Sequence, residues 1–83
     1  MKLLYFAWLR AKLGKPGEDL TPPAYVTNVG EMLDWLATVS PAHAAALADR
    51  RAVKVAVNQD YAGLDHPVKP GDEIALFPPV TGG

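Results

Sequence analysis

The chain has 83 residues, a hydrophobic share of 49%, a charged share of 20% and a formal net charge of -1. This length permits one small domain, and the composition excludes a disordered chain and a strongly basic nucleic-acid binder. The sequence contains no cysteine, which excludes disulfides, thiolate nucleophiles and cysteine-ligated metals and is typical of a reducing compartment. We therefore expect one cytoplasmic domain with no nucleic-acid partner.

Three short elements are predicted at the start of the chain. Residues 2–9 are bulky and apolar without a breaker, which predicts a central strand with two apolar faces. This run is too short to cross a bilayer and lacks the pattern of a secretory signal, so we expect no membrane partner. Residues 8–13 can form a helical turn ended by Gly14. Residues 18–21 predict a brief strand, which Pro22-Pro23 confines to an edge of the sheet.

The clearest predicted helix follows Asn28. Asn28 can cap its first turn while Glu31 reaches back to Asn28, an arrangement called a capping box. Apolar residues then recur at the spacing of one buried helical stripe: Val29, Met32, Leu33, Leu36 and Val39. A second short helix is predicted over residues 42–48, because Ser40 provides a capping hydroxyl and Pro41 suits the first helical position.

The second half of the chain predicts further strands. Residues 52–58 alternate in side-chain character with a period of two, as in a strand that has one face on the core. Residues 61–64 can form a short edge strand. Pro70 and Gly71 occupy the positions that a type II turn favours for them. Residues 73–77 then predict a final strand, which two prolines end.

This order of elements favours an α+β fold of the ubiquitin-like β-grasp class. A mixed sheet would pack on one main helix plus a short second helix, with the first and last strands side by side in its middle. The last strand would then release the chain directly into solvent. We expect a β-grasp domain at residues 1–77 and a protruding C-terminal tail at residues 78–83.

The predicted tail is suited to presenting its last residue. Pro78-Pro79 removes two backbone donors and fixes φ, and the β-branched side chains of Val80 and Thr81 keep the path extended. Gly82 and Gly83 carry no Cβ, so they fit a channel too narrow for other residues. From Pro79 to Gly83 an extended chain reaches at most about 16 Å, roughly the depth of an enzyme pocket. Gly83 is therefore the candidate reactive residue.

The terminal group needs activation from outside the chain. A free carboxyl terminus ionises with a pKa of about 3.3–3.7, and the resulting carboxylate is a poor electrophile. Acyl-adenylation by a partner that uses ATP would turn one carboxylate oxygen into a leaving group. The sequence has no phosphate-binding glycine loop. We therefore expect no cofactor bound by this chain, and ATP used in trans by an adenylating enzyme.

Several segments of the chain are distinctive: Leu4–Ala7, Ala56–Gln59, Asp65–Pro67, Gly71–Glu73 and Phe77–Gly83. Together they resemble the family of molybdopterin synthase small subunits, which are ubiquitin-like sulfur carriers. The related carriers of the thiamine pathway share the fold and the final Gly-Gly, but the Phe-Pro-Pro approach is more similar to the molybdenum-cofactor branch. Pro22-Pro23 departs from the family pattern and leaves the length of the second strand open.

This resemblance implies a cycle of sulfur transfer. An E1-like adenylating enzyme would activate Gly83, a sulfur donor protein would convert it to a thiocarboxylate, and the large synthase subunit would receive the loaded tail. Sulfur would then pass to cyclic pyranopterin monophosphate. The chain would act as a non-catalytic, reusable co-substrate within a hetero-oligomer, which the family suggests is a heterotetramer.

The strand periods also predict a docking surface. If the larger apolar residues of the two long late strands face the helix, Ala56, Ala75 and Phe77 face outward, and Phe6 joins them from the first strand. Tyr61 would border this patch. A large apolar outer face on a small domain normally marks a partner site. The resemblance implies that this patch packs against the large subunit and the adenylating enzyme. The alternative is that Phe6 or Phe77 belongs to the core.

The remaining polar residues suggest structural roles. His43 and His66 have no second ligand at metal-binding spacing, which predicts surface histidines and no metal site. Ser40 has no obvious base partner and is interpreted as a helix cap rather than a nucleophile. Asp72 adjoins a tight turn, where solvated acids are usual, and residues 50–54 are interpreted as a solvated charged group.

Three function classes follow from these features. A sulfur carrier, for molybdopterin or for another pathway such as thiamine thiazole formation, would gain one sulfur at Gly83. A ubiquitin-like protein modifier would form isopeptide bonds and give a ladder of heavier adducts. A passive interaction module would depend on the sheet face, so Phe77→Asp would abolish its function while deletion of the tail would not.

Overall fold

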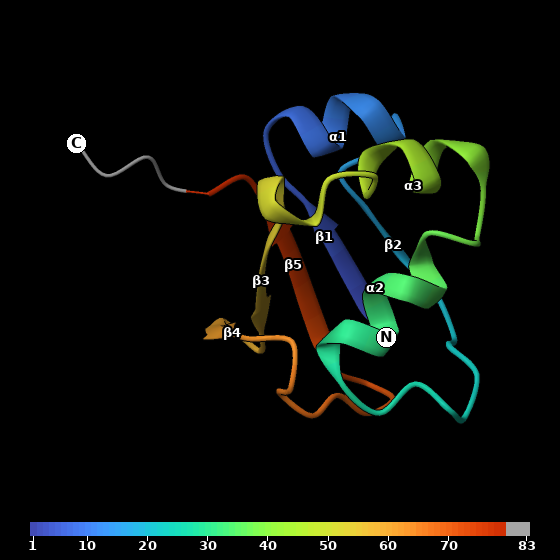
Figure 1. Ribbon diagram of the computed structural model, residues 1–83, viewed down its shortest axis with the longest axis vertical. Helices are drawn as coiled ribbons and strands as arrows, with labels where there is room; N and C mark the ends of the chain where they lie inside the picture. Colours follow the sequence, from blue (N-terminus) through green and yellow to red (C-terminus); the bar gives the residue numbers. More distant parts are fainter. Residues whose placement is uncertain (80–83) are drawn as a thin grey trace.

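The computed structural model describes residues 1–79, which form one five-stranded sheet with the helices over one face (Figure 1). The strands are β1 (Lys2–Tyr5), β2 (Gly17–Asp19), β3 (Lys54–Val57), β4 (Asp60–Ala62) and β5 (Glu73–Phe77). The helices are α1 (Trp8–Leu13), α2 (Val29–Leu36), α3 (Pro41–Ala46) and the short 3-10 helix η1 (Arg50–Ala52). The predicted α+β class is confirmed, and η1 is a helix that the sequence did not predict.

The sheet has the strand order β2-β1-β5-β3-β4. The central strands β1 and β5 run parallel, and Leu3 of β1 pairs with Ile74 of β5. β3 is antiparallel to β5, and the edge strands β2 and β4 are antiparallel to their neighbours. This is the β-grasp arrangement expected from the sequence, in which strands from opposite ends of the chain lie side by side in the middle.

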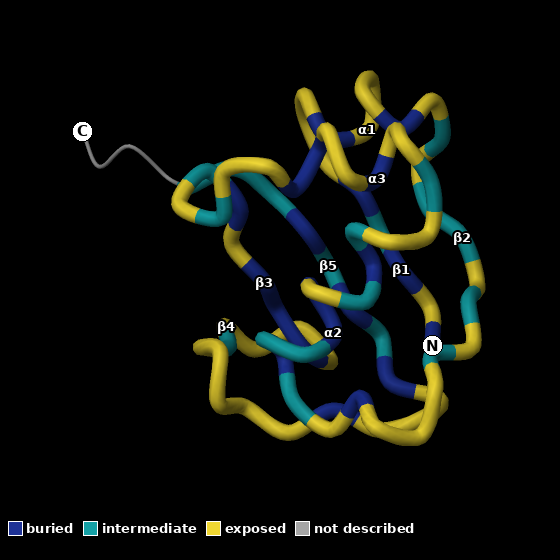
Figure 2. Tube along the Cα trace, turned by 45° about the vertical axis from the view of Figure 1, so that its right-hand side comes forward, coloured by how far each residue is buried: buried dark blue, intermediate teal, exposed yellow. Residues whose placement is uncertain are grey.

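One hydrophobic core lies between the sheet and the helices. On the inner sheet face the buried residues are Leu3, Tyr5, Val55, Val57, Ile74 and Leu76. From the three α-helices they are joined by Leu9, Leu13, Val29, Met32, Leu33, Leu36 and Ala46. Figure 2 shows the buried stretches of β1, β3 and β5 facing α2. Burial of each large apolar side chain contributes about 1.5–3 kcal/mol, so this face carries most of the stability. The predicted inward phase of β3 and β5 is confirmed.

The start and end of α2 differ in detail from the prediction. The helix ends at Leu36, so Val39 lies beyond it and is 39% exposed instead of joining the buried stripe. Asn28 Oδ1 accepts from the backbone N of Glu31 at 2.8 Å, as predicted. The Glu31 carboxylate accepts from the backbone N of Thr27 at 2.9 Å, one residue before the Asn28 backbone contact of a capping box. The helix start is therefore fixed one residue further back than in a capping box.

The bend between β1 and α1 holds a non-glycine residue in a strained backbone conformation. β1 ends at Tyr5, short of the predicted Leu9, because Ala7 turns the chain with φ 57° and ψ -133°. A conformation of this kind costs an L-residue about 1–3 kcal/mol. We expect Ala7→Gly to raise the free energy of unfolding by about 1 kcal/mol, measured by urea denaturation.

Ala11→Gly provides the matched control for this prediction. Ala11 lies in the middle of α1 and is exposed, so glycine there should lower the free energy of unfolding by about 1 kcal/mol. Opposite signs for the two substitutions would confirm strain at Ala7, whereas a loss at both positions would show that the bend is relaxed.

The loop before β5 confirms one prediction and corrects another. Gly71 has φ 91°, as a type II turn requires, and the backbone N of Asp72 donates to Lys69 O at 3.2 Å. Asp72 is not solvated, since it is only 6% exposed. Its carboxylate accepts from the Lys69 backbone N at 2.9 Å and from Asn58 Nδ2 at 3.2 Å. Burial favours a higher pKa for Asp72, but these hydrogen bonds outweigh burial and lower it. Asp72 thus ties the turn to the end of β3.

The edge strands are short. β2 pairs with β1 over residues 17–19, not over the predicted residues 18–21, and beyond them one backbone bond joins Leu20 N to Met1 O at 3.0 Å. β4 pairs with β3 over residues 60–62, at the start of the predicted segment 61–64. Among residues 1–79, no helix has the length and apolar character to span a membrane.

Candidate functional site

The outer face of the sheet, opposite the core, carries the predicted docking residues. Strand pairing places Leu4, Ala75, Ala56 and Tyr61 in one row that crosses β1, β5, β3 and β4. None of the four side chains belongs to the core cluster, and Tyr61 is 79% exposed. The helices cover only the inner face, so this apolar row faces away from the body of the domain (Figure 1).

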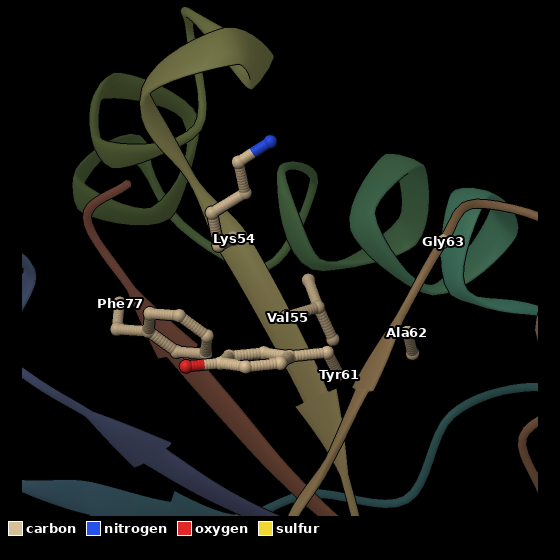
Figure 3. A pocket seen from close by; sticks show the side chains of 6 residues that line it. All are labelled: Lys54, Val55, Tyr61, Ala62, Gly63 and Phe77. Carbon is tan, nitrogen blue, oxygen red and sulfur yellow. The ribbon is translucent and has the colours of Figure 1, made fainter. Parts of the chain in front are cut away.

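Aromatic residues gather at the end of this face where β5 leads toward the tail. Phe77 pairs with Lys54 of β3, and the backbone N of Phe6 donates to Leu76 O at 3.1 Å. Phe6 is 41% exposed and Phe77 is half-buried, so neither is a core residue. The Tyr61 ring lies beside the Phe77 ring, with centroids 5.6 Å apart and planes inclined by 49° (Figure 3). Phe6, Tyr61, Ala75 and Phe77, which are predicted docking residues, therefore all lie outside the core cluster.

An open hollow of about 460 Å³ lies beside the two rings. Its lining comes from β3, β4, β5 and the residue after β4: Lys54, Val55, Tyr61, Ala62, Gly63 and Phe77 (Figure 3). In Figure 3 the Lys54 side chain extends from β3 away from both rings. Lys54 is not among the predicted site residues, because only the β3–β5 register, which composition does not reveal, brings it opposite Phe77.

The predicted tail begins at this end of the sheet. Pro78 and Pro79 follow β5, are half-buried, and carry the chain outward from the end of the strand (Figure 1). The predicted tail residues Val80 and Thr81, and the predicted reactive pair Gly82-Gly83, lie outside the described residues. The described part of the chain thus places the root of the tail directly beside the aromatic hollow.

A second polar arrangement lies on the inner side of the sheet, beside α3. His43, predicted at the surface, is only 4% exposed. Its Nε2 lies 2.7 Å from Glu18 Oε2, and its Nδ1 lies 2.7 Å from Ser40 Oγ. The Tyr5 hydroxyl donates to Glu18 Oε2 at 2.6 Å, and Lys15 Nζ donates to Glu18 Oε1 at 2.8 Å. One carboxylate therefore joins β1, β2 and α3. Glu18, His43, Ser40, Tyr5 and Lys15 are called the Glu18 cluster below.

The electrostatics of the Glu18 cluster follow from its donors. Because an ionised carboxylate only accepts, His43 Nε2 donates to Glu18. Burial alone would raise the pKa of Glu18, but hydrogen bonds from Lys15, Tyr5 and His43 outweigh it and lower the pKa to about 2. Burial raises the pKa of Tyr5, and the hydrogen bond and charge of Glu18 raise it further. The carboxylate stays ionised and the phenol stays neutral.

The order Ser40-His43-Glu18 matches that of a catalytic triad, but its geometry is structural. Ser40 Oγ also accepts from the backbone N of His43 at 3.2 Å, which is the capping role predicted from the sequence. The expectation that Ser40 lacks a base partner is wrong, yet the base itself is closed off from solvent and a substrate cannot reach it. The Glu18 cluster is therefore a clamp that holds α3 to the β1–β2 edge.

The described residues offer little for a metal. His66 is exposed, and its Nδ1 lies 2.9 Å from Pro67 O. Among residues 1–79, no group of three or more histidine, aspartate and glutamate side chains could hold a metal ion. The outer face and the root of the tail therefore form the strongest candidate site in the described part of the chain.

Known proteins are similar to this chain in sequence and in fold. The sequence model of the ThiS family matches residues 3–83. The molybdopterin synthase sulfur carrier subunit of Escherichia coli (strain K12) is 39% identical over 100% of this chain and 99% of its own length. The protein of the same name from Haemophilus influenzae is 36% identical with the same coverage. Among solved structures, SAMP1 from Haloferax volcanii, small archaeal modifier protein 1, superposes with a TM-score of 0.74. It is 33% identical over 100% of this chain and 98% of that chain.

Proposed function

We propose that this chain, which belongs to the ThiS family, is the sulfur carrier subunit of a molybdopterin synthase. The observation that carries the proposal is the unbroken match to the family and to two sulfur carrier subunits, which runs through the final Gly82-Gly83. The exposed apolar face that ends on Phe77, at the root of the tail, supports it, because a carrier must dock while its tail enters an enzyme.

The chemistry resides at Gly83. The terminal carboxylate attacks the α-phosphorus of ATP in an E1-like adenylating enzyme, pyrophosphate leaves, and an acyl-adenylate forms. Sulfur at the oxidation level of sulfide, delivered by a sulfur donor protein, then attacks the acyl carbon: a C–S bond forms, the C–O bond to the phosphate breaks, AMP leaves, and the product is a thiocarboxylate. Gly82 and Gly83 carry no side chains, so the reacting carbonyl stays open to attack inside a narrow channel. This chain contributes the tail and the docking face, while ATP binds to the partner.

The loaded tail then delivers its sulfur in the large synthase subunit. Two prolines and the β-branched side chains of Val80 and Thr81 favour an extended chain on sequence grounds, and in this proposal such a tail brings Gly83 to cyclic pyranopterin monophosphate bound by the large subunit. Two deliveries complete the dithiolene of molybdopterin. The complex is a cytoplasmic hetero-oligomer, with two small and two large subunits as the family arrangement.

Intact-mass measurement tests this proposal. The purified chain is incubated with its adenylating enzyme, ATP and a sulfur donor, and its mass should rise by the difference between one sulfur and one oxygen atom at Gly83. Omission of ATP is the control and should leave the mass unchanged. A mass that never changes in the complete reaction would contradict the sulfur-carrier function.

A second candidate function is protein modification. It is favoured by the similarity to SAMP1, small archaeal modifier protein 1. An activated Gly83 attacked by a lysine amine of another protein would form an isopeptide bond, with AMP as the leaving group. This function predicts a ladder of heavier adducts in cell extracts that disappears when Gly83 is deleted, whereas a dedicated sulfur carrier gives no such ladder.

The docking face yields a prediction of its own. We expect Phe77→Asp to weaken binding to the large synthase subunit by about 30-fold or more, because loss of an aromatic hot spot costs about 2 kcal/mol or more. Tyr25→Asp is the matched control, since Tyr25 is an exposed aromatic residue (61%) in the loop between β2 and α2. Calorimetric titration of both variants, after circular dichroism has shown that each is folded, measures the effect. If Phe77→Asp and Tyr25→Asp bind the large subunit with equal affinity, Phe77 is not part of the contact.

A further inference from the structure

We infer that the hollow beside Tyr61 and Phe77 receives an acidic–apolar segment of the protein that accepts the tail, with a partner carboxylate bound by Lys54. This inference rests on the proposed function, because it concerns the surface that meets the tail-accepting protein. It goes further by naming the chemistry of the segment that must line the entrance of the acceptor channel.

The charges around the hollow support this reading. Lys54 is exposed and makes no ion pair within residues 1–79. The two neighbouring cations are engaged, since Arg50 Nη1 lies 2.9 Å from Asp34 Oδ1 and Arg51 Nε lies 3.3 Å from Asp49 Oδ1. Lys54 is therefore the cation at the root of the tail that is available to an external carboxylate.

The apolar lining of the hollow indicates that the partner segment is also apolar. The rings of Tyr61 and Phe77 line the hollow together with Val55, Ala62 and Gly63. Tyr61 is 79% exposed, a large aromatic surface left open to water in the described domain. An apolar side chain that enters the hollow would cover both rings. Because the Lys54 side chain leads away from the rings (Figure 3), the carboxylate that meets its ammonium group would come from another residue of the same partner segment. Neither an acidic nor an apolar group alone would satisfy the whole lining.

The maximum length of the tail limits how far the partner's surface can lie from the root of the tail. Six residues follow Phe77, and an extended chain of six residues spans at most about 20 Å. An enzyme that buries Gly83 at the bottom of a deep pocket must therefore bring the rim of that pocket down to the root of the tail. Because Lys54 pairs directly with Phe77, this rim has to cover Lys54. This geometry identifies the part of the partner that contacts the chain, namely the rim of its pocket. The positive charge of Lys54 favours a negative charge on that rim.

Zero-length crosslinking tests the contact directly. The wild-type chain is mixed with the large synthase subunit and a water-soluble carbodiimide, which joins an amine to an adjacent carboxylate with loss of water. We expect mass spectrometry to find Lys54 joined to an aspartate or glutamate that lies next to apolar residues of the large subunit. Crosslinks that involve other lysines but never Lys54, or that join Lys54 to a second copy of this chain, would overturn the inference.

Charge reversal provides an independent test in solution. We expect Lys54→Glu to slow association with the large subunit about tenfold at low salt, while Lys54→Arg stays within about twofold of the wild type. Lys12→Glu is the matched control, because Lys12 is exposed on α1 and makes no ion pair within residues 1–79. The effect of Lys54→Glu should shrink at high salt, since screening weakens it.

These experiments distinguish failure of the proposed function from failure of the Lys54 contact alone. The wild-type chain is first shown to gain sulfur at Gly83 and to bind the large subunit, and failure at that step overturns the proposed function and this inference together. If the wild type succeeds and Lys54→Glu associates as fast as Lys12→Glu, only the role of Lys54 is wrong.

Discussion

Deletion of Gly83 is expected to reduce sulfur loading below detection while the domain stays folded. Without Gly83 the chain ends at Gly82, so the carboxylate retreats by about 3.5 Å from the position at which we propose that it is adenylated. Among the described residues 1–79, all members of the core lie between Met1 and Leu76, so we expect the core to be unaffected. Intact-mass spectrometry after incubation with the adenylating enzyme measures loading, and the thermal midpoint measures folding.

A chain extended by one alanine after Gly83 is the matched control. It keeps both glycines but moves the carboxylate outward by about the same distance, so it should also fail to load. If the shortened chain still supports molybdopterin formation, the reactive group is not the terminal carboxylate. If the extended chain loads as well as the wild type, loading does not depend on the exact position of the terminal carboxylate in the acceptor channel.

The second large effect concerns the Glu18 cluster. We expect Glu18→Ala to lower the free energy of unfolding by about 2–4 kcal/mol, because a buried hydroxyl and a buried imidazole each lose their acceptor. For a domain of this size the thermal midpoint should fall by about 8–32 °C. Tyr5 and His43 are the residues left without a partner, and both are nearly inaccessible to water.

Lys15→Ala is the control for the loss of charge pairing alone. The Lys15 side chain is 43% exposed, and a surface ion pair contributes about 0.2–1 kcal/mol, so this variant should lose little. A similar loss in the two variants would mean that the ion pair to Lys15, and not the buried hydrogen bonds, supports the clamp.

The same carboxylate makes stability depend on pH. The pKa of Glu18 falls from an ordinary 4.5 to about 2 on folding, so folding favours its charged form. The contribution is therefore fully present above about pH 4.5 and is lost as the pH falls toward 2. Urea denaturation at several pH values in this window should show a steeper loss for the wild type than for Glu18→Gln. Parallel curves would contradict the assignment.

Much of the fold could be predicted because its signals are local. Residues 52–58 and 73–77 alternate strongly, and Asn28 and Ser40 are good caps, so the strands and helices they define were found. Errors arose where tertiary contacts decide. Val39 continues the helical spacing, but α2 stops at Leu36 and leaves it in a turn.

The candidate site was predictable on the outer face and not elsewhere. The period of two places Ala75 and Phe77 opposite the core, and the structure has this phase. The position of Lys54 opposite Phe77 depends on register, and the burial of His43 depends on Glu18, which is 25 residues away along the chain. Side chains that meet only through the fold leave no mark in a local pattern. The sequence does place a histidine three residues after a capping serine, a spacing that permits contact between Ser40 and His43.

The parallel pairing of β1 with β5 also governs when this molecule can fold during its synthesis. Leu3 needs Ile74 beside it, so the sheet has a gap between β1 and β3 until residues 73–77 have been made. Such distant pairing makes folding slow and late, and a nascent chain that stops early exposes its apolar strands to proteases and chaperones. Only chains translated as far as the root of the tail can complete the sheet, so formation of the core and synthesis of the tail's attachment point are coupled.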